Sequence, residues 1–327
     1  MPPTADLPSP GDVLDAAARI AVHAHATPVL RSRALDEAAD ARLHFKAEHL
    51  QRAGAFKFRG ACNAVFALDE ATAARGVVTH SSGNHGAALA LAARLRGIAC
   101  HVVVPEGAVR AKRAAIAHYG AVLHPCAPTI AAREAACARV QAETGARVVH
   151  PYTDARVIAG QGTAALELLR AVPDLDAVVV PLGGGGLAAG TALALRALAP
   201  ACALFLAEPA GAADGARSFA RGVLDHEFVP DTVCDGLRGT LGAPNFALLR
   251  AADARVLTVD DARTVAAMRL LWTRTKQLVE PSSAIALAAV LAHPALFAGR
   301  RVGIVLSGGN VDLDAVPALF ALAGEAA

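Results

Sequence analysis

One lysine of this chain, Lys57, lies in an apolar neighbourhood between Phe56 and Phe58. Burial disfavours the charged form of an amine, so a buried lysine has a lowered pKa. The neutral amine is a nucleophile that can form a Schiff base with an aldehyde. The alternative is a lysine on an amphipathic helix whose ammonium group reaches the solvent. Lysine is scarce in the sequence, which contains only Lys46, Lys57, Lys112 and Lys276.

Four consecutive glycines, Gly183 to Gly186, follow the apolar run 177–180 and precede a helical pattern. Glycines let the backbone curl so that several N–H groups face one anion, and the helix N-terminus adds a favourable dipole. The loop is not a P-loop, because no Gly-Lys-Ser/Thr follows, and it lacks the dinucleotide-binding register. A phosphate cradle together with a nucleophilic lysine suggests a phosphorylated aldehyde cofactor, of which pyridoxal phosphate is the common one. The alternative is a flexible turn.

Two further polar loops each follow an expected strand. The first, Ser81-Ser82-Gly83-Asn84-His85-Gly86, offers hydroxyls, an amide and backbone N–H groups just before a helix. These groups suit binding of a carboxylate and of the phenolic oxygen of the cofactor, and the alternative is a helix cap made by Ser82 or Asn84. The second loop, 306–312, contains Ser307, a neutral partner for a ring nitrogen, and its alternative is a simple turn.

Elements that position these loops follow from the hydrophobic pattern. Short runs with a strand pattern alternate with segments of helical periodicity, which predicts βαβ units and an α/β fold with mostly parallel sheets. In such sheets ligands bind beyond the carboxyl ends of the strands, where the glycine- and serine-rich loops lie. Met1 to Ser9 is expected to be a disordered lead-in. Strands are expected at 42–47, 77–80, 101–104, 121–124, 147–149, 177–180, 203–207, 256–259 and 302–306, and helices at 12–24, from about 56, 87–95, 109–118, 130–143, 157–169, 186–198, 264–272 and 283–291.

Length and composition limit the class of protein. The chain has 327 residues, enough for two domains, and 54% of them are apolar. Its net charge is +2 and its basic residues are dispersed, which argues against a nucleic-acid partner. No apolar run is long enough to cross a membrane, and the N-terminus has no signal-peptide pattern. None of the six cysteines forms a CxxC pair, which favours reduced, buried thiols and a cytoplasmic protein.

Motifs from about Leu43 to Leu313, nearly the whole chain, together carry a resemblance to a known family. The chain resembles the pyridoxal-phosphate-dependent serine/threonine dehydratase and serine racemase family, which has fold type II and is similar to the tryptophan synthase β chain. The segment from His150 to Thr163 also matches this family. The other matching motifs, in order, are 54–61 (GAFKFRGA), 81–86 (SSGNHG), 183–187 (GGGGL), 280–283 (EPSS) and 307–310 (SGGN).

The resemblance implies a role for each loop. Lys57 would hold the cofactor as a Schiff base, Asn84 would bond its phenolic oxygen, and Ser307 would meet its pyridine nitrogen. The phosphate would be held by the backbone of Gly183, Gly184, Gly185, Gly186 and Leu187. The substrate carboxylate would be bound by the loop Ser81, Ser82, Gly83, Asn84 and His85.

The resemblance also implies a domain organisation. A large discontinuous domain would comprise 1–73 and 153–327. A small mobile domain, 74–152, would be inserted in it and would close over the site.

A second group of candidate site residues follows the strand expected at 203–207. Glu208, the carbonyl of Ala212 and Asp214 have a spacing that suits an oxygen-only site for Mg²⁺ or Ca²⁺. A solvated acidic loop is the alternative. Similarity to the metal loop of racemase-like members of the family favours the cation.

Three positions affect the choice of substrate. Tyr152 stands where animal racemases have an asparagine and microbial dehydratases more often have an aromatic residue. Gly239-Thr240 replaces a turn that contains serine. Arg133 resembles an arginine that can reach a second substrate carboxylate, and its alternative is a solvated helix face.

We expect from the resemblance an ammonia-lyase that dehydrates and deaminates L-threonine or L-serine to 2-oxobutyrate or pyruvate. Lys57 would remove the Cα proton, and Ser82, on the opposite face, could return one and racemise the substrate. The alternatives are a serine racemase or a threo-3-hydroxyaspartate ammonia-lyase on the same scaffold, and, from another class, a non-catalytic pyridoxal-phosphate-binding protein. The presence of Lys57, Ser82 and Asn84 argues against the last. The expected partners are a small amino acid and a second copy of the chain in a homodimer.

Overall fold

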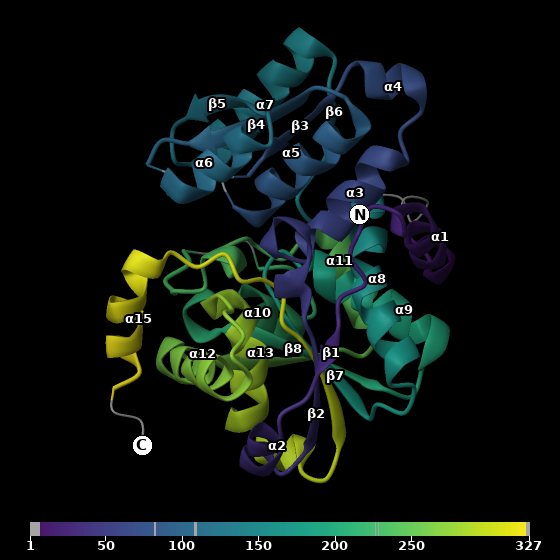
Figure 1. Cartoon of the computed structure of the whole chain (residues 1–327). Helices are drawn as coiled ribbons and strands as arrows, with labels where there is room; N and C mark the ends of the chain where they lie inside the picture. The colour runs from purple at the N-terminus through teal and green to yellow at the C-terminus, as the bar shows by residue number, and fades with distance from the viewer. Residues whose placement is uncertain (1–6, 82, 108–109, 226, 228, 325–327) are drawn as a thin grey trace.

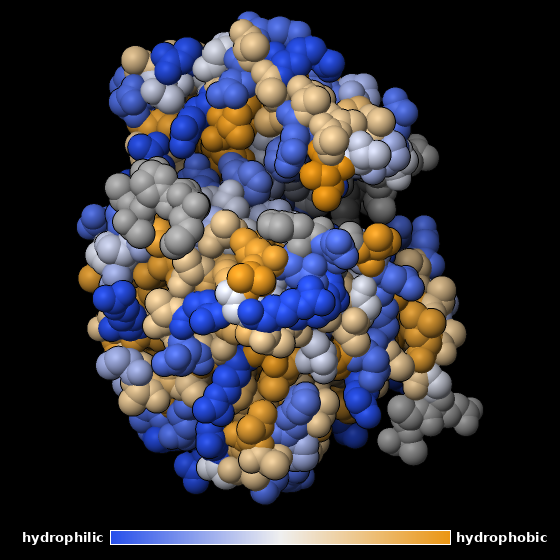
Figure 2. Space-filling model, turned by 180° about the vertical axis from the view of Figure 1, so that it is seen from behind, coloured by the Kyte–Doolittle hydropathy of each residue, from blue (hydrophilic) through white to orange (hydrophobic). Residues whose placement is uncertain are grey.

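The computed structural model describes residues 7–81, 83–107, 110–225, 227 and 229–324. Two sheets, each flanked by helices, form two lobes, a smaller one above a larger one in Figure 1. Seen from behind, hydrophilic and hydrophobic residues are intermingled over the surface of both lobes (Figure 2). No helix in the described ranges has the length and apolar character needed to cross a membrane.

The larger lobe contains a six-stranded sheet in the order β1-β2-β10-β7-β8-β9. All neighbouring pairs are parallel except β1 with β2. The predicted α/β fold with mostly parallel strands is therefore confirmed. The strands are β1 (Val29–Leu30), β2 (Arg42–Lys46), β7 (Ala177–Pro181), β8 (Ala203–Pro209), β9 (Arg255–Val259) and β10 (Arg301–Val305).

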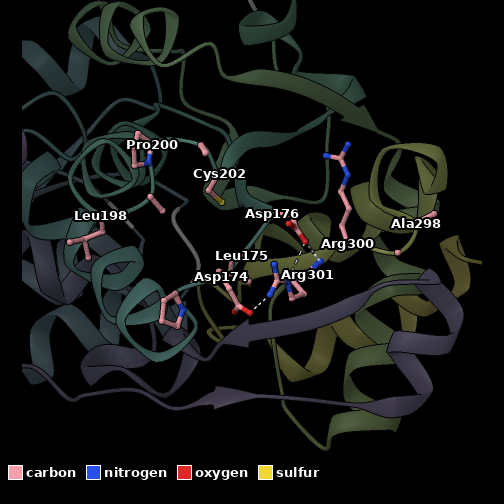
Figure 3. Close-up of a pocket in the computed structure, with 13 residues that line it drawn as sticks. Asp174, Leu175, Asp176, Leu198, Pro200, Cys202, Ala298, Arg300 and Arg301 are labelled. Atoms are coloured by element: carbon pink, nitrogen blue, oxygen red, sulfur yellow. Dashed lines mark hydrogen bonds and ion pairs between the residues drawn. The ribbon is translucent and has the colours of Figure 1, made fainter.

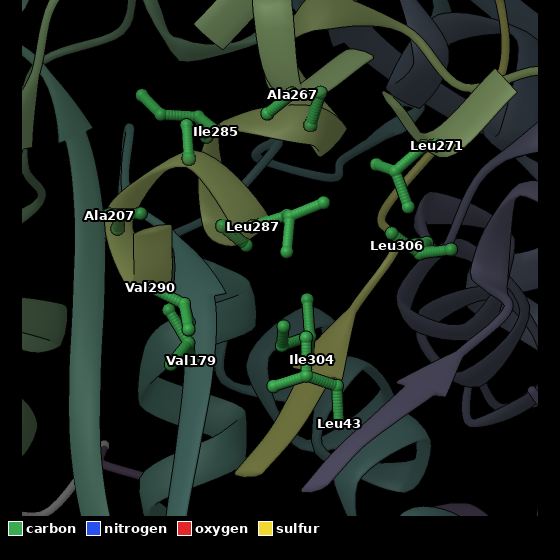
Figure 4. Close-up of a cluster of buried hydrophobic side chains, with 14 of the residues drawn as sticks. Leu43, Val179, Ala207, Ala267, Leu271, Ile285, Leu287, Val290, Ile304 and Leu306 are labelled. Carbon is green, nitrogen blue, oxygen red and sulfur yellow. The ribbon is translucent and has the colours of Figure 1, made fainter. Parts of the chain in front are cut away.

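Both faces of this sheet are covered by helices. Side chains of a strand alternate between the faces, and in β7 Val179 packs on one side while Val178 and Val180 pack on the other. On the Val179 side lie α12 (Asp261–Thr275) and α13 (Pro281–Ala292), whose apolar side chains meet those of β2 and β10 in Figure 4. The opposite side is covered by α1 (Pro10–Ile20), α8 (Ala155–Ala171) and α9 (Gly186–Leu198).

The smaller lobe contains a parallel four-stranded sheet in the order β5-β4-β3-β6. All four strands lie within 74–152, the range that the sequence assigns to a small domain, while the domain boundaries and the closing motion stay predictions. Its strands are β3 (Val77–His80), β4 (Cys100–Pro105), β5 (Val122–Cys126) and β6 (Arg147–Val148), and its helices are α4 (Glu70–Ala74), α5 (Asn84–Arg96), α6 (Arg110–His118) and α7 (Ile130–Thr144).

Helix α3 (Lys57–Phe66) lies where the two lobes meet and contacts α5 of the smaller lobe and α8 of the larger one. The position of Lys57 in the first turn of this helix agrees with the pattern in the sequence. Several short elements were not predicted from the hydrophobic pattern. They are β1, α2 (Arg33–Ala39), α4, α10 (Asp214–Arg221), α11 (Ala243–Ala251), α14 (Pro294–Phe297) and α15 (Val316–Leu322).

The expected disordered lead-in is wrong at its C-terminal end. Ser9 caps α1, because its side chain accepts a hydrogen bond from the backbone N–H of Asp12 and its own N–H donates to the Asp12 carboxylate at 2.8 Å. This reciprocal pair is a capping box, which satisfies N–H groups that a helix start leaves unpaired. Residues 1–6 of the lead-in lie outside the described ranges.

Candidate active site

Lys57 is half-buried at the start of α3, and its Nζ atom donates a hydrogen bond to the carbonyl oxygen of Pro151 at 3.0 Å. The ammonium position also lies 5.2 Å from the centre of the Phe56 ring. Burial lowers the pKa of Lys57 to about 8. Within the described ranges Lys57 forms no ion pair that would raise the pKa again. The alternative of a lysine that extends into solvent from its helix does not fit this environment.

A second lysine, Lys46, is more deeply buried but has a different environment. Its Nζ atom bonds a carboxylate oxygen of Glu167 at 2.5 Å and lies 4.0 Å from Glu48. Burial lowers its pKa, and the two carboxylates oppose that shift. Opposite charges at this distance favour the ammonium form, which is not nucleophilic. The two buried lysines therefore differ in partners, and Lys57 has the environment that suits Schiff-base chemistry.

Arg59 lies two residues after Lys57 and is fully buried. Its guanidinium bonds Glu48 at 2.7 Å and Glu167 at 2.7 Å, so that with Lys46 two cations and two anions form one buried network. The network ties α3 to the segment after β2 and to α8. Its members lie up to 121 residues apart, so no local pattern in the sequence indicates the network.

The start of α3 is also positioned by a close approach to α8. A Cβ atom placed on Gly160 would lie 2.6 Å from the Cα of Gly60 and 2.7 Å from the carbonyl oxygen of Arg59. Only glycine permits this helix separation. Glycines of α3 and α8 therefore bring Lys57 close to the segment that carries Pro151.

The tetraglycine loop joins β7 to α9, which begins at Gly186. Gly185 has a φ of 89°, and a Cβ atom on Gly184 would lie 2.4 Å from the ring of Tyr152. The carbonyl of Gly184 accepts hydrogen bonds from Asn245 and from the N–H of Gly242. The first N–H groups of a helix have no partner within it, so those from Gly183 to Leu187 can bind a phosphate. A side chain at 184 would collide with the Tyr152 ring, so glycine is required at this position of the loop.

Ser307 follows β10, the strand next to β7, so its loop lies at the same edge of the sheet as the glycines. It is buried, and its carbonyl oxygen accepts a hydrogen bond from the N–H of Phe56 at 2.9 Å. A bridge between Ala55 and Gly308 adds a second backbone contact. The loop that contains Ser307 is therefore joined directly to the residues that precede Lys57.

The serine-rich loop after β3 carries Asn84 as the first residue of α5. The Nδ2 group of Asn84 donates to Glu280 at 2.9 Å, and its Oδ1 atom accepts from Asn310 at 2.9 Å. The alternative in which Asn84 caps the helix is wrong, because Gly83 occupies the N-cap position. Ser81 accepts a hydrogen bond from the N–H of Gly83 at 3.4 Å. Ser82 lies outside the described residues.

Two histidines, His150 and His85, lie near enough to Lys57 for its charge to lower their pKa, and His80 lies against His150. His150 accepts hydrogen bonds at Nδ1 from the N–H groups of Tyr152 and Thr153, and burial lowers its pKa to about 4, with His80 and Lys57 adding to the shift. The rings of His80 and His150 are 5.3 Å apart. The pKa of His85 is also well below its usual value, mainly through burial, and its Nε2 atom lies 3.3 Å from the carbonyl oxygen of Val149. These rings are neutral at pH 7 and add no positive charge near Lys57.

Arg133, on α7, is a cation on the small-lobe side of the site. It is half-buried, and its Nε atom is buried without a hydrogen-bond partner among the described residues. Burial lowers the pKa of His80 most, and the charge of Arg133 lowers it further. The same charge acts to lower the pKa of Tyr152, which burial raises. Tyr152 in turn bonds the Thr240 side chain and covers Gly184. A fully solvated helix face does not describe Arg133, whose guanidinium is available to an anion.

Glu208 and Asp214 are both buried. Glu208 accepts hydrogen bonds from the N–H groups of Gly215 and Ala216 at 2.8 Å each, and Asp214 accepts from the N–H of Leu241 at 2.7 Å. Burial raises the pKa of Glu208 to about 8 and also raises the pKa of Asp214. The alternative of a solvated acidic loop is therefore wrong. Ala212, whose carbonyl completes the predicted ligand set, is buried beside them.

Of two hollows in the structure, the smaller is lined by a predicted site residue, Asn84, and the larger is not. The smaller, about 360 Å³, is lined by Asn84 and Asn310 together with residues of α5, α6 and the loop before α3. The larger, about 760 Å³, lies where β7, β8 and β10 begin, around Asp174, Cys202 and Arg301 (Figure 3). Parallel α/β sheets bind ligands beyond the carboxyl ends of their strands. The larger hollow is at the opposite edge and is not the site.

Comparisons with known proteins agree with this geometry. A family model described as pyridoxal-phosphate dependent enzyme matches residues 20–308. The chain is 49% identical to the beta-hydroxyaspartate dehydratase of Paracoccus denitrificans, covering 95% of this chain and 99% of that protein. It is 46% identical to a serine racemase of Arabidopsis thaliana, covering 91% and 92%. The structure of maize serine racemase superposes with a TM-score of 0.93 at 44% identity, covering 95% and 96%, and a threonine deaminase of T.th. with 0.89 at 43%, covering 94% and 99%.

Proposed function

The chain belongs to the pyridoxal-phosphate-dependent enzymes of fold type II, and we propose that it is an ammonia-lyase acting on a β-hydroxy amino acid with a second carboxylate. 3-Hydroxyaspartate is an amino acid of this kind. Its dehydration and deamination would yield oxaloacetate and ammonia. Dehydration of L-serine or L-threonine, the expectation from the sequence, is the second candidate. It is favoured by the similarity to serine racemases and a threonine deaminase, which are named for monocarboxylic amino acids.

The observation that carries the proposal is the environment of Arg133. Its charge acts on His80 and Tyr152, and its buried Nε atom has no hydrogen-bond partner among the described residues. The neighbouring histidines are neutral, so Arg133 can supply the positive charge that a distal carboxylate needs. A charge-assisted hydrogen bond is worth about 1.5–3 kcal/mol, or roughly tenfold to a hundredfold in binding. The methyl group of threonine would leave that donor unpaired.

Residues of the site fit pyridoxal phosphate. Lys57 would hold it covalently, the N–H groups from Gly183 to Leu187 would bind its phosphate, and Ser307 would face its ring nitrogen. Asn84 would donate to its phenolic oxygen. When bound, the cofactor supplies an electron sink for the electron pair left on the substrate Cα.

Proton transfer at the substrate Cα would be the task of Lys57. An amine with a pKa of about 8 is partly neutral at pH 7 and can accept a proton there. Ser82 would return a proton from the opposite face, which would racemise the amino acid. Ser81, Gly83 and His85, with Asn84, remain our proposal for the loop that binds the α-carboxylate.

Glu208, Asp214 and the carbonyl of Ala212 would bind a divalent cation. The two buried carboxylates have raised pKa values, so their charged forms lack sufficient compensation from the protein alone. An oxygen-only ligand set suits Mg²⁺ or Ca²⁺. A homodimer in the cytoplasm also stays part of the proposal.

The test is a comparison of keto-acid release from 3-hydroxyaspartate stereoisomers, L-serine and L-threonine by the holoenzyme. We expect kcat/KM for one hydroxyaspartate isomer to exceed that for L-serine by at least about tenfold. Arg133→Met should lower the hydroxyaspartate value by about tenfold or more and change the L-serine value little. Arg139→Met is the matched control, since Arg139 is an exposed arginine on the same helix. Equal losses on both substrates would contradict the assignment of Arg133.

A further inference from the structure

The amide of Asn84 makes two hydrogen bonds of opposite polarity to the larger lobe. Its Nδ2 group donates to Oε1 of Glu280 at 2.9 Å, and its Oδ1 atom accepts from Nδ2 of Asn310 at 2.9 Å. Asn84 begins α5 of the smaller lobe, Glu280 is the N-cap residue of α13, and Asn310 follows β10. Three separate segments therefore converge on one amide.

These bonds allow one orientation of the amide. Oε1 of Glu280 accepts the hydrogen bond from Nδ2 of Asn84 at 2.9 Å, and a carboxylate oxygen without a proton can only accept. Asn310 uses Nδ2 twice, toward Asn84 and toward the carbonyl oxygen of Ala53 at 2.8 Å, and a carbonyl also only accepts. The Ala53 carbonyl thus fixes Asn310, which then requires Oδ1 of Asn84. A flipped Asn84 would face an acceptor with its oxygen and a donor with its nitrogen.

We propose that Glu280 and Asn310 are positioning residues that fix the amide of Asn84 so that an N–H, and not the oxygen, faces the phenolic oxygen of the cofactor. This inference rests on the proposed function, in which Asn84 meets that oxygen. One of the two Nδ2 hydrogens is used by Glu280, and the second is available to the cofactor. A donor there stabilises the phenolate, whereas the amide oxygen would repel it.

The network borders the smaller hollow and the segment that precedes Lys57. Asn84 and Asn310 line the hollow of about 360 Å³ together with Ala53 and Gly54, next to the start of α3. Gly54 has a φ of 72°, and a Cβ atom on it would lie 2.4 Å from Oδ1 of Asn310. The backbone before Lys57 is thus shaped to hold Asn310 against Ala53. The same segment therefore carries both the amine and the carbonyl that fixes Asn310.

Isosteric variants separate orientation from shape. The double variant Glu280→Gln/Asn310→Asp reverses both polarities, since Gln at 280 can donate to Oδ1 of Asn84 and Asp at 310 can accept from Nδ2. It therefore favours the flipped amide. Glu280→Gln alone keeps an acceptor toward Asn84 and leaves Asn310 as a donor, so it keeps the native orientation. Asn310→Asp alone opposes one of the two bonds of Asn84 and also removes the bond to the Ala53 carbonyl, a loss that the double variant shares.

The experiment measures pyridoxal phosphate binding to the apoprotein by absorbance, together with the thermal midpoint of each apoprotein. In the double variant we expect the dissociation constant to rise by about tenfold or more, because a hydrogen bond becomes a repulsion. The long-wavelength Schiff-base band should lose intensity to the short-wavelength band of the uncharged tautomer. Glu280→Gln should change the constant by less than about threefold. If the double variant does not fold, Asn310→Asp should show the same spectral shift to a smaller extent.

Two outcomes would overturn the inference in different ways. A double variant whose affinity and spectrum equal those of Glu280→Gln would show that the amide orientation is not set by these residues, while the proposed function stands. A wild-type protein that forms no Schiff-base band with pyridoxal phosphate would overturn the proposed function and this inference with it.

Discussion

The Nζ atom of Lys57 and the carbonyl oxygen of Pro151 are joined by a hydrogen bond of 3.0 Å. Pro151 lies in the segment between β6 of the smaller lobe and α8 of the larger one, so the amine is held at the junction of the lobes. A carbonyl accepts a hydrogen bond from either the amine or the ammonium form, whereas a carboxylate such as the partner of Lys46 favours the charge. This difference in partner is why we assign the Schiff base to Lys57 and not to Lys46.

Capture of pyridoxal phosphate by the apoprotein should accelerate with pH. Burial lowers the pKa of Lys57 to about 8, so the neutral amine fraction grows mainly between about pH 7 and 9. Stopped-flow absorbance at a fixed cofactor concentration measures the rate. A midpoint near the usual lysine value of about 10.4 would contradict the environment described for Lys57.

Divalent cations should change how stability depends on pH. Burial raises the folded-state pKa of Glu208 to about 8, above the ordinary glutamate pKa of 4.5, so the native state binds more protons than the unfolded state between these two values. Without a cation the free energy of unfolding should therefore fall as pH rises from about 4.5 to 8. A cation bound only by the folded state should reduce this loss.

The measurement is the thermal midpoint at pH 5 and pH 8, with chelator and with Mg²⁺ or Ca²⁺. The expected result is a larger gain from the cation at pH 8. Glu208→Gln should remove most of the cation effect, whereas Glu70→Gln, at an exposed carboxylate, serves as the control. Identical midpoints with chelator and cation, together with no metal by elemental analysis, would argue against the site.

Arg59→Met should destabilise the fold strongly. It leaves the buried Glu48 and the partly buried Glu167 without their guanidinium partner, and breaking a buried ion pair from one side costs about 3–5 kcal/mol. Arg31→Met, which removes an exposed pair with Asp36, should cost less than about 1 kcal/mol. Urea unfolding of the apoproteins measures the free energy of unfolding of each variant. A similar loss of stability in the two variants would contradict the claim that the buried network stabilises the fold.

Ser82→Ala should abolish racemisation while part of the Lys57-dependent elimination survives. In the proposed mechanism Lys57 and Ser82 act on opposite faces of the substrate Cα. Chiral chromatography of the amino acid and a keto-acid assay follow the two reactions in one sample. Racemisation that persists in Ser82→Ala, or a parent enzyme that never racemises, would leave Ser82 as a binding residue only.

Periodicity located the main elements of the fold well. The helix predicted at 186–198 has those bounds in α9, and the strand at 177–180 differs from β7 by one residue. Long apolar runs and glycine loops are local signals, so they can be identified in the sequence. β1 has two residues and α14 has four, too few for a period to appear. Their positions depend on packing against distant elements.

Candidate site residues could be predicted where their neighbours in the sequence indicate their chemistry. Contacts between residues that are distant in the sequence could not be predicted in this way. Lys57 and the tetraglycine loop could be found from neighbours in the sequence. The pairing of Arg59 with Glu167 joins residues 108 positions apart, and Asn84 meets Glu280 across 196 positions. No periodic pattern encodes such contacts. Glu280 and Asn310 were within the recognised motifs, but their hydrogen bonds to Asn84 needed the structure.

Reductive trapping tests the central claim most directly, namely that Lys57 is the amine through which this enzyme works. The holoenzyme is treated with borohydride, which converts a Schiff base into a stable secondary amine, and the labelled peptide is identified by mass spectrometry. We predict a label on Lys57 in the wild-type protein, and no label in Lys57→Ala. A label on Lys46 or Lys276, or no label in the wild-type protein, would contradict the account.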